Sequence, residues 1–229
     1  MKYVLLLAVF ASAFSFTSCA KDDNPASTNP GYNIVAKGTY KNHSWGEWSG
    51  MWWSWALAMP DGANAVQGTA PMETNQSGEV WFLSGNFKGG SETRTITVPA
   101  GKALFISLIN FYADTTGGYP PADSLMILAQ LIWDGSSAKV DLFEIDGKAV
   151  DNVAANYYAP VTSFMNQNIP LKNVIGDQTY GKDKISSLAA SCGYYMMIDG
   201  LSTGTHTIHF KASNMNPLSI DMTYNITVK

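Results

Sequence analysis

The chain has few charged residues, and its basic residues form no cluster. Only 14% of its 229 residues are Asp, Glu, Lys or Arg, and the formal net charge is −4. Charged residues usually make up about a quarter of a globular domain. Proteins that bind nucleic acid neutralise phosphates with clustered Lys and Arg, so this composition excludes a nucleic-acid partner. Ser, Thr, Asn and Gly must cover the surface instead, which is typical of secreted, β-rich proteins.

Motifs for catalysis and for metal binding are also missing. No Gly-x-Ser-x-Gly nucleophile elbow occurs. The chain has three histidines, and two of them, His206 and His209, fall on one predicted strand. Residues three apart on a strand point to opposite faces, so these two cannot share one ion, and we expect no metal and no cofactor. His206 shares its face with Ile208 and Phe210, which predicts a core histidine with satisfied hydrogen bonds.

No hydrophobic run is long enough to cross a membrane as a helix. The longest, Val4 to Phe16, has thirteen residues and follows Lys2, which is typical of a signal-peptide core. Cys19 follows this run three residues later. The sequence Phe16-Thr17-Ser18-Cys19 resembles a bacterial lipobox, with Phe16 where leucine is usual. The resemblance implies a signal peptide at residues 1–18 and diacylation (palmitate) at Cys19. The alternative is an ordinary cleaved signal with an incidental cysteine.

Residues 19–31 are expected to be a tether. The sequence Ala20 to Asn24 resembles the acidic signal that sends lipoproteins to the outer face of the outer membrane in some Gram-negative anaerobes; a plain solvated linker is the alternative. We therefore expect a lipid anchor in the outer membrane, with the domain on the cell surface or the periplasmic face. If Cys19 is lipidated, Cys192 is the only other cysteine and no intramolecular disulfide forms. We expect Cys192 to be a buried small hydrophobe.

Tryptophan is concentrated in one segment. Five of the seven tryptophans lie in the eleven residues from Trp45 to Trp55, and four recur at helical spacing. Ser44 and Glu47 form a capping-box pattern at the start of this helix, and Pro60 ends it. Glycines on the opposite face predict a helix that is buried on both sides. The alternative role, stacking on a ligand such as a sugar, falls to the off-stripe Trp53, with His43 and Glu47 as neighbouring candidates for ligand binding.

The rest of the chain has patterns that predict β-strands and one further short helix. Ala103 to Ile109 predicts a central strand, residues 124–133 a second short helix after Asp123, and residues 138–150 a hairpin turning at Asp-Gly. Residues 156–187 show no period. Ser219 to Val228 alternates strictly between polar and apolar residues. We therefore expect residues 32–229 to form one mainly β domain, an antiparallel β-sandwich, immunoglobulin-like or jelly-roll-like, with an N-terminal Trp-rich helix and a second short helix.

Five segments together resemble an uncharacterised family of secreted bacterial proteins. They are Glu47-Trp48-Ser49, Trp52 to Pro60, Val80 to Gly85, Val98 to Phe105 and Gly204 to Phe210. The resemblance covers most of residues 40–229 and implies no activity. Members of the family often carry cysteines between residues 61 and 98, where this chain has none.

Three functions remain open from the sequence. The leading hypothesis is a non-catalytic binding or structural module that recognises glycan or another envelope component. The second is a glycosidase-like hydrolase that uses a pair of carboxylates, for which the candidates are Glu47, Asp114, Asp123, Asp141 and Glu144. The third is a subunit of a surface assembly, in which an exposed last strand pairs with a partner.

Overall fold

The computed structural model describes residues 31–116, 120–170, 172–177, 184–215 and 218–229. The predicted signal peptide, the predicted lipid-attachment residue Cys19 and the predicted tether up to residue 30 lie outside these described residues. None of the described helices is long and apolar enough to span a membrane.

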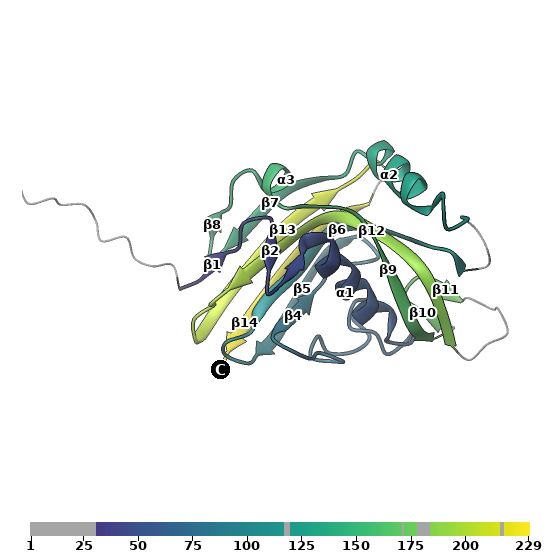
Figure 1. Cartoon of the computed structure of the whole chain (residues 1–229). Helices are drawn as coiled ribbons and strands as arrows, with labels where there is room; N and C mark the ends of the chain where they lie inside the picture. Colours follow the sequence, from purple (N-terminus) through teal and green to yellow (C-terminus); the bar gives the residue numbers. More distant parts are fainter. Residues whose placement is uncertain (1–30, 117–119, 171, 178–183, 216–217) are drawn as a thin grey trace, which may run out of the picture.

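Two five-stranded sheets form the body of the domain (Figure 1). In the first sheet the order is β1-β12-β6-β4, and β9 also pairs with β12. Its strands are β1 (Asn33–Ile34), β4 (Val80–Leu83), β6 (Ala103–Asp114), β9 (Tyr158–Pro170) and β12 (Lys184–Asp199). In the second sheet the order is β5-β14-β13-β7-β8. Its strands are β5 (Gly90–Val98), β7 (Lys139–Ile145), β8 (Lys148–Ala149), β13 (Gly204–Ser213) and β14 (Ser219–Val228).

The two sheets bury apolar faces against each other, which confirms the predicted β-sandwich. The alternation along β14 puts five side chains in this core: Ile220, Met222, Tyr224, Ile226 and Val228. Strand β6 is buried on both faces along its first half, as a central strand should be. Most pairings are antiparallel, but β4 pairs with β6 and β5 pairs with β14 in parallel.

The tryptophan helix α1 (Trp45–Leu57) packs on the outer face of the first sheet (Figure 1). Its capping box is present, and its four stripe tryptophans are buried. The opposite face is close to β9, because glycine leaves room there: a Cβ at Gly46 would overlap Thr162, and one at Gly50 would lie 2.9 Å from the Phe164 ring. The helix is therefore buried on both sides, as predicted.

The second helix α2 (Leu125–Gly135) covers the first sheet beyond the edge of the second sheet. It buries Leu125, Ala129 and Trp133. Asp123 was expected to cap it, but Ser124 occupies the N-cap position and no side chain caps the helix. Its outer face leaves Ile127 and Leu131 each 65% exposed.

Residues 156–187 are more regular than the sequence predicts. The end of a short helix, α3 (Val153–Asn156), is followed by β9, by the small hairpin of β10 (Lys172–Asn173) and β11 (Gly176–Asp177), and by the start of β12. A second small hairpin, β2 (Thr39–Tyr40) and β3 (His43–Ser44), precedes α1. The sequence of β9 does not alternate between apolar and polar residues, because small and polar residues such as Thr162 fill the narrow space under Gly46.

The last strand is not an edge strand. Strand β14 pairs with β13 along its whole length on one side and with β5 on the other. The expectation that it offers a free edge to a partner is therefore wrong. The predicted hairpin at Asp146 and Gly147 is present, and both turn residues have the positive φ that this kind of turn requires.

Candidate functional site

Strand β4 accompanies β6 for only four residues. The parallel pairing runs from Val80 opposite Ala103 to Leu83 opposite Ile106 and stops there. The carbonyl of Leu83 accepts a hydrogen bond of 2.8 Å from the indole N–H of Trp52. After Leu83 the chain leaves the first sheet and crosses to the second, where it becomes β5.

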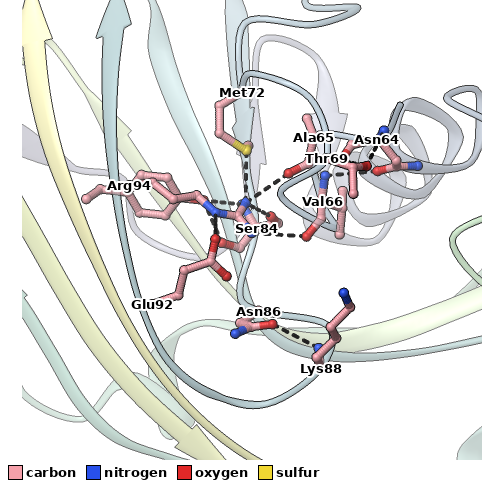
Figure 2. A network of polar contacts seen from close by, with 11 residues as sticks. Asn64, Ala65, Val66, Thr69, Met72, Ser84, Asn86, Lys88, Glu92 and Arg94 are labelled. Carbon is pink, nitrogen blue, oxygen red and sulfur yellow. Dashed lines mark hydrogen bonds and ion pairs between the residues drawn. The ribbon is translucent and has the colours of Figure 1, made fainter. Parts of the chain in front are cut away.

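A buried network around Arg94 holds this crossing segment against the second sheet (Figure 2). The guanidinium of Arg94 donates to the Ser84 hydroxyl at 3.2 Å and forms an ion pair of 2.6 Å with Glu92. The Tyr224 hydroxyl donates to the carbonyl of Ser84 at 2.7 Å and accepts from its N–H at 3.3 Å. Ser84 is therefore bonded to the second sheet and cannot continue along β6.

The same arginine holds the long connection between α1 and β4. Its guanidinium also donates to the main-chain carbonyls of Ala65 and Val66, at 3.0 and 3.1 Å. Inside this connection the buried side chain of Asn64 donates to the carbonyls of Ala56 and Met59. Figure 2 shows Arg94 surrounded by Ala65, Val66, Ser84 and Glu92, which come from segments far apart in the sequence.

Where the chain leaves β6, an apolar groove opens. The groove has a volume of about 350 Å³, in the usual range for ligand sites, about 300–1,000 Å³. Its walls come from α1, the crossing segment, the second half of β6 and the loops before β14 and β11. The lining residues used below are Trp53, Phe87, Asn110, Phe111, Tyr112, Asp114, Ile175 and Leu218.

Aromatic rings form one wall of the groove. The ring of Trp53 lies 4.6 Å from that of Tyr112 and meets the edge of Phe87 at 5.9 Å. Trp53 is only 3% exposed, whereas Phe87 is 36% exposed. The face that a ligand can reach is therefore made by Tyr112 and Phe87, with Trp53 supporting both rings from behind.

One carboxylate belongs to the described lining of the groove. Asp114 accepts a hydrogen bond of 2.7 Å from the Tyr112 hydroxyl and another from the N–H of Thr116. The Tyr112 hydroxyl in turn accepts from the side-chain amide of Asn166. Burial, together with the neighbouring Asp114 charge, raises the pKa of Tyr112 well above its usual range. Tyr112 is therefore a neutral hydrogen-bonding group, and Asp114 carries the negative charge of the groove.

The main chain of β6 is open toward the groove. The N–H of Thr115 donates to Leu188 on β12 at 2.9 Å. Main-chain groups of successive strand residues point to opposite sides, so Phe111 and Ala113 also face β12, while Asn110, Tyr112 and Asp114 face away from it. No described strand pairs with β6 on that side beyond Ile106. The second half of β6 is therefore an open sheet edge.

The predicted ligand-binding residues are not brought together. Trp53 lines the groove, but His43 and Glu47 lie at the start of α1, where the His43 ring meets the edge of Trp48 at 5.3 Å. Glu47 accepts hydrogen bonds from the N–H and hydroxyl of Ser44, and these lower the pKa of its carboxyl. Glu47 is thus accounted for by the helix cap.

Tyr112, Asn110 and Phe87 were missed by the sequence analysis. The predicted central strand stopped at Ile109, where the continuous apolar run ends, but β6 continues to Asp114. The signal was the polar character of every second residue, Asn110, Tyr112 and Asp114, which is the pattern of a strand with one face less buried.

The histidines serve other contacts. His209 lies on the outer face of the second sheet between Asp221, at 2.8 Å, and Glu144, at 3.4 Å. In the described part of the chain no cluster of His, Cys, Asp or Glu could hold a metal ion. Cys192 is fully buried, and burial raises the pKa of its thiol to about 12.

His206 lies in an arrangement that resembles a catalytic triad. Its Nδ1 is 2.8 Å from Asp146 Oδ2, and its Nε2 is 3.2 Å from the hydroxyl of Ser202. However, Nε2 is also 3.0 Å from the main-chain carbonyl of Ser202, which can only accept. Nε2 is thus shared between the hydroxyl and a carbonyl that lies closer, whereas the base of a triad faces the serine hydroxyl. The contacts of His206 therefore link the turn at Asp146 to the turn that contains Ser202.

Of the five carboxylates suggested for a hydrolase, two lie on β7 and the other three lie on separate segments. Asp114 is in the groove, Glu47 caps α1, and Asp123 precedes α2. On β7, Asp141 pairs with Lys139, and Glu144 pairs with His209. Glycoside hydrolysis by two carboxylates needs them about 5–10 Å apart across one cleft. The described groove lining contains Asp114 but no second carboxylate.

Comparison with known proteins does not assign the chain to a family. No protein-family model matches the chain, and no curated protein matches it. Among solved structures, one match is the solution structure of amebosin, with 16% identity and a TM-score of 0.20 over 61% of this chain and 96% of that one. Another is PbICP-C in complex with falcipain-2, with 14% identity and a TM-score of 0.26 over 66% of this chain and 100% of that one. Both TM-scores are too low to support an argument about fold or function.

Proposed function

We propose that this protein is a non-catalytic binding module of the cell envelope and that the groove beside β6 holds its ligand. The observation that carries the proposal is the groove itself, whose described residues combine an aromatic wall, an open sheet edge and one carboxylate. Concave, mostly apolar sites with a few convergent polar groups are typical of ligand binding. The ligand is a component of the envelope, either a glycan or a protein.

The place of action rests on the sequence pattern at Cys19. Lipidation there would attach the domain to the outer membrane through the tether, on the cell surface or the periplasmic face. Mass spectrometry of the mature N-terminus tests this directly. A diacylglyceryl-modified Cys19 is the expected result, and an unmodified N-terminus would contradict the anchor without affecting the groove.

Binding in the groove can be tested with two matched isoleucine substitutions. Ile175 lines the groove and is 37% exposed, whereas Ile127 lies on the outer face of α2 and is 65% exposed. The full-length chain is incubated with purified envelope polysaccharide and with envelope protein, and binding is measured by tryptophan fluorescence. We expect Ile175→Glu to weaken binding about tenfold or more, because it places a charge in an apolar site.

The matched variant Ile127→Glu should bind like the unchanged protein. Equal binding by both variants would contradict the groove as the site. Replacing Trp53 is a poorer test, because this ring is buried and its loss would destabilise the fold by about 3–5 kcal/mol.

A further inference from the structure

The open edge of β6 restricts the chemistry of the ligand. Unpaired main-chain N–H and C=O groups that are partly withdrawn from water need hydrogen-bonding partners. Among the described residues such groups belong to Asn110, Tyr112 and Asp114, which alternate along one edge of β6 and are all partly buried. Alternate residues on a strand are about 7 Å apart, and each presents one donor and one acceptor. An extended polypeptide has this same spacing and presents the complementary main-chain donors and acceptors.

The two sides of the groove would receive the alternating side chains of such a segment. On the α1 side, Tyr112 and Phe87 form the aromatic wall. On the other side, Phe111 and Leu218 line the groove and pack against the same small apolar cluster. A strand between these walls would place apolar side chains on both sides, as in known complexes formed by strand addition.

The charge of the groove adds a further requirement. Asp114 accepts two hydrogen bonds and, as a carboxylate, has further lone pairs available. No basic side chain belongs to the described lining, so this charge is not neutralised within the groove. A Lys or Arg side chain of the ligand would complement it.

We propose that the ligand is an extended, apolar segment of a partner protein that carries a basic residue and adds as a strand to β6 along residues 110–114. This inference rests on the proposed binding function and names its ligand class. It also restores, at a different edge, the strand pairing that the sequence suggested for β14.

The test is selection from a phage-displayed library of random decapeptides on the immobilised full-length chain, with Ile175→Lys as the counter-selection and Ile127→Lys as its matched control, because a cation in the groove repels a basic peptide. We expect enriched peptides to alternate apolar residues and to carry Lys or Arg. Asp114→Asn should weaken the best peptide about threefold to tenfold through loss of the charge pair. Ile127→Glu, which is remote from the groove, should bind it like the unchanged chain.

Main-chain pairing is tested on the best peptide by N-methylation. Methylating alternate amides removes the donors on one edge of the peptide and leaves its side chains intact. We expect methylation of one edge to weaken binding about thirtyfold and methylation of the other to change it less than about threefold, since only one edge faces β6. Equal effects from the two edges, or no effect from either, would overturn strand addition.

The remaining outcomes separate this inference from the proposed function. If no peptide is enriched but envelope polysaccharide binds and Ile175→Glu abolishes that binding, strand addition is wrong and the groove function stands. If neither class binds, both fall. If the full-length chain is dimeric at micromolar concentration and the peptide dissociates it, the occupant is a second copy and not a partner protein.

Discussion

Strand β6 has two halves with different neighbours. From Ala103 to Ile106 it lies between β12 and β4, and its side chains are fully buried. From residue 107 to 114 it keeps β12 on one side, but β4 is gone and the burial falls from Asn110 onward. Both halves pair with the same strand, so they differ in what lies on the other side of β6.

The segment that follows β4 determines where β6 loses its second neighbouring strand. Ser84 follows directly after the last residue of β4, and its hydroxyl and main chain are bonded to Arg94 and Tyr224 of the second sheet. These bonds turn the chain away from β6 one residue after Leu83. The network around Arg94 thus creates the sheet edge to which we propose that the ligand adds.

The largest expected effect on stability comes from disrupting the first half of β6, where the strand lies between β12 and β4. Trp52 is 1% exposed and donates to the carbonyl of Leu83, so Trp52→Ala leaves both a cavity and an unpaired carbonyl. We expect the free energy of unfolding to fall by about 3–5 kcal/mol, measured by urea denaturation. Trp52→Phe keeps part of the ring and should cost less. A loss below about 1 kcal/mol for the alanine variant would contradict the role assigned to Trp52.

The next effect comes from releasing the crossing segment. Arg94→Leu removes the bonds to Ser84, Ala65 and Val66 and leaves Glu92 unpaired. We expect a loss of about 3 kcal/mol in the free energy of unfolding. Hydrogen exchange should rise in the connection before β4. The exposed Lys88 on the same segment is the control, and Lys88→Ala should stay within about 0.5 kcal/mol.

A smaller effect on stability is expected in the second half of β6, where no described strand replaces β4. Tyr112→Phe keeps the ring against Trp53 but removes the hydroxyl that links Asp114 with Asn166. The loss should be about 1 kcal/mol in the free energy of unfolding, as for one buried hydrogen-bonding group. Because the ring remains, the groove keeps its shape. A change in ligand affinity far larger than the change in stability would show that the hydroxyl itself contacts the ligand.

An effect that depends on pH is expected at Cys192, which pairs with Phe111 on the side of β6 that faces β12. Burial raises the pKa of its thiol to about 12, so the folded state holds this proton more tightly than the unfolded state does. The contribution to stability is therefore complete below about pH 8.5, the pKa of a free thiol, and is lost as the pH rises toward 12. Urea denaturation at pH 7 and pH 10 should show this fall, and Cys192→Ala should reduce it.

The sequence predicts the parts of this fold that depend on local pattern. The spacing of Trp45, Trp48, Trp52 and Trp55 and the capping box at Ser44 predict α1, and the alternation after Ser219 predicts β14. The partners of β14 depend on contacts between distant segments. No local pattern indicates that β5 lies beside β14, because parallel neighbours leave no turn signal between them.

The groove was only partly predictable for the same reason. Trp53 was singled out because it lies off the stripe, and it does line the groove. The open edge could not be predicted, because it depends on Ser84 meeting Arg94 and Tyr224 across the two sheets. His43 and Glu47 were grouped with Trp53 by proximity in sequence, but the helix separates them from the groove.

Residue-resolved hydrogen exchange of β6 tests the central claim most directly. If the first half is closed and the second is open, the amides of residues 103–106 are all protected, while protection alternates beyond residue 109. Phe111 and Ala113 should exchange slowly, and Asn110, Tyr112 and Asp114 quickly, because their N–H groups face away from β12. Uniform protection from residue 103 to 114 would contradict the open edge and, with it, the proposed strand addition.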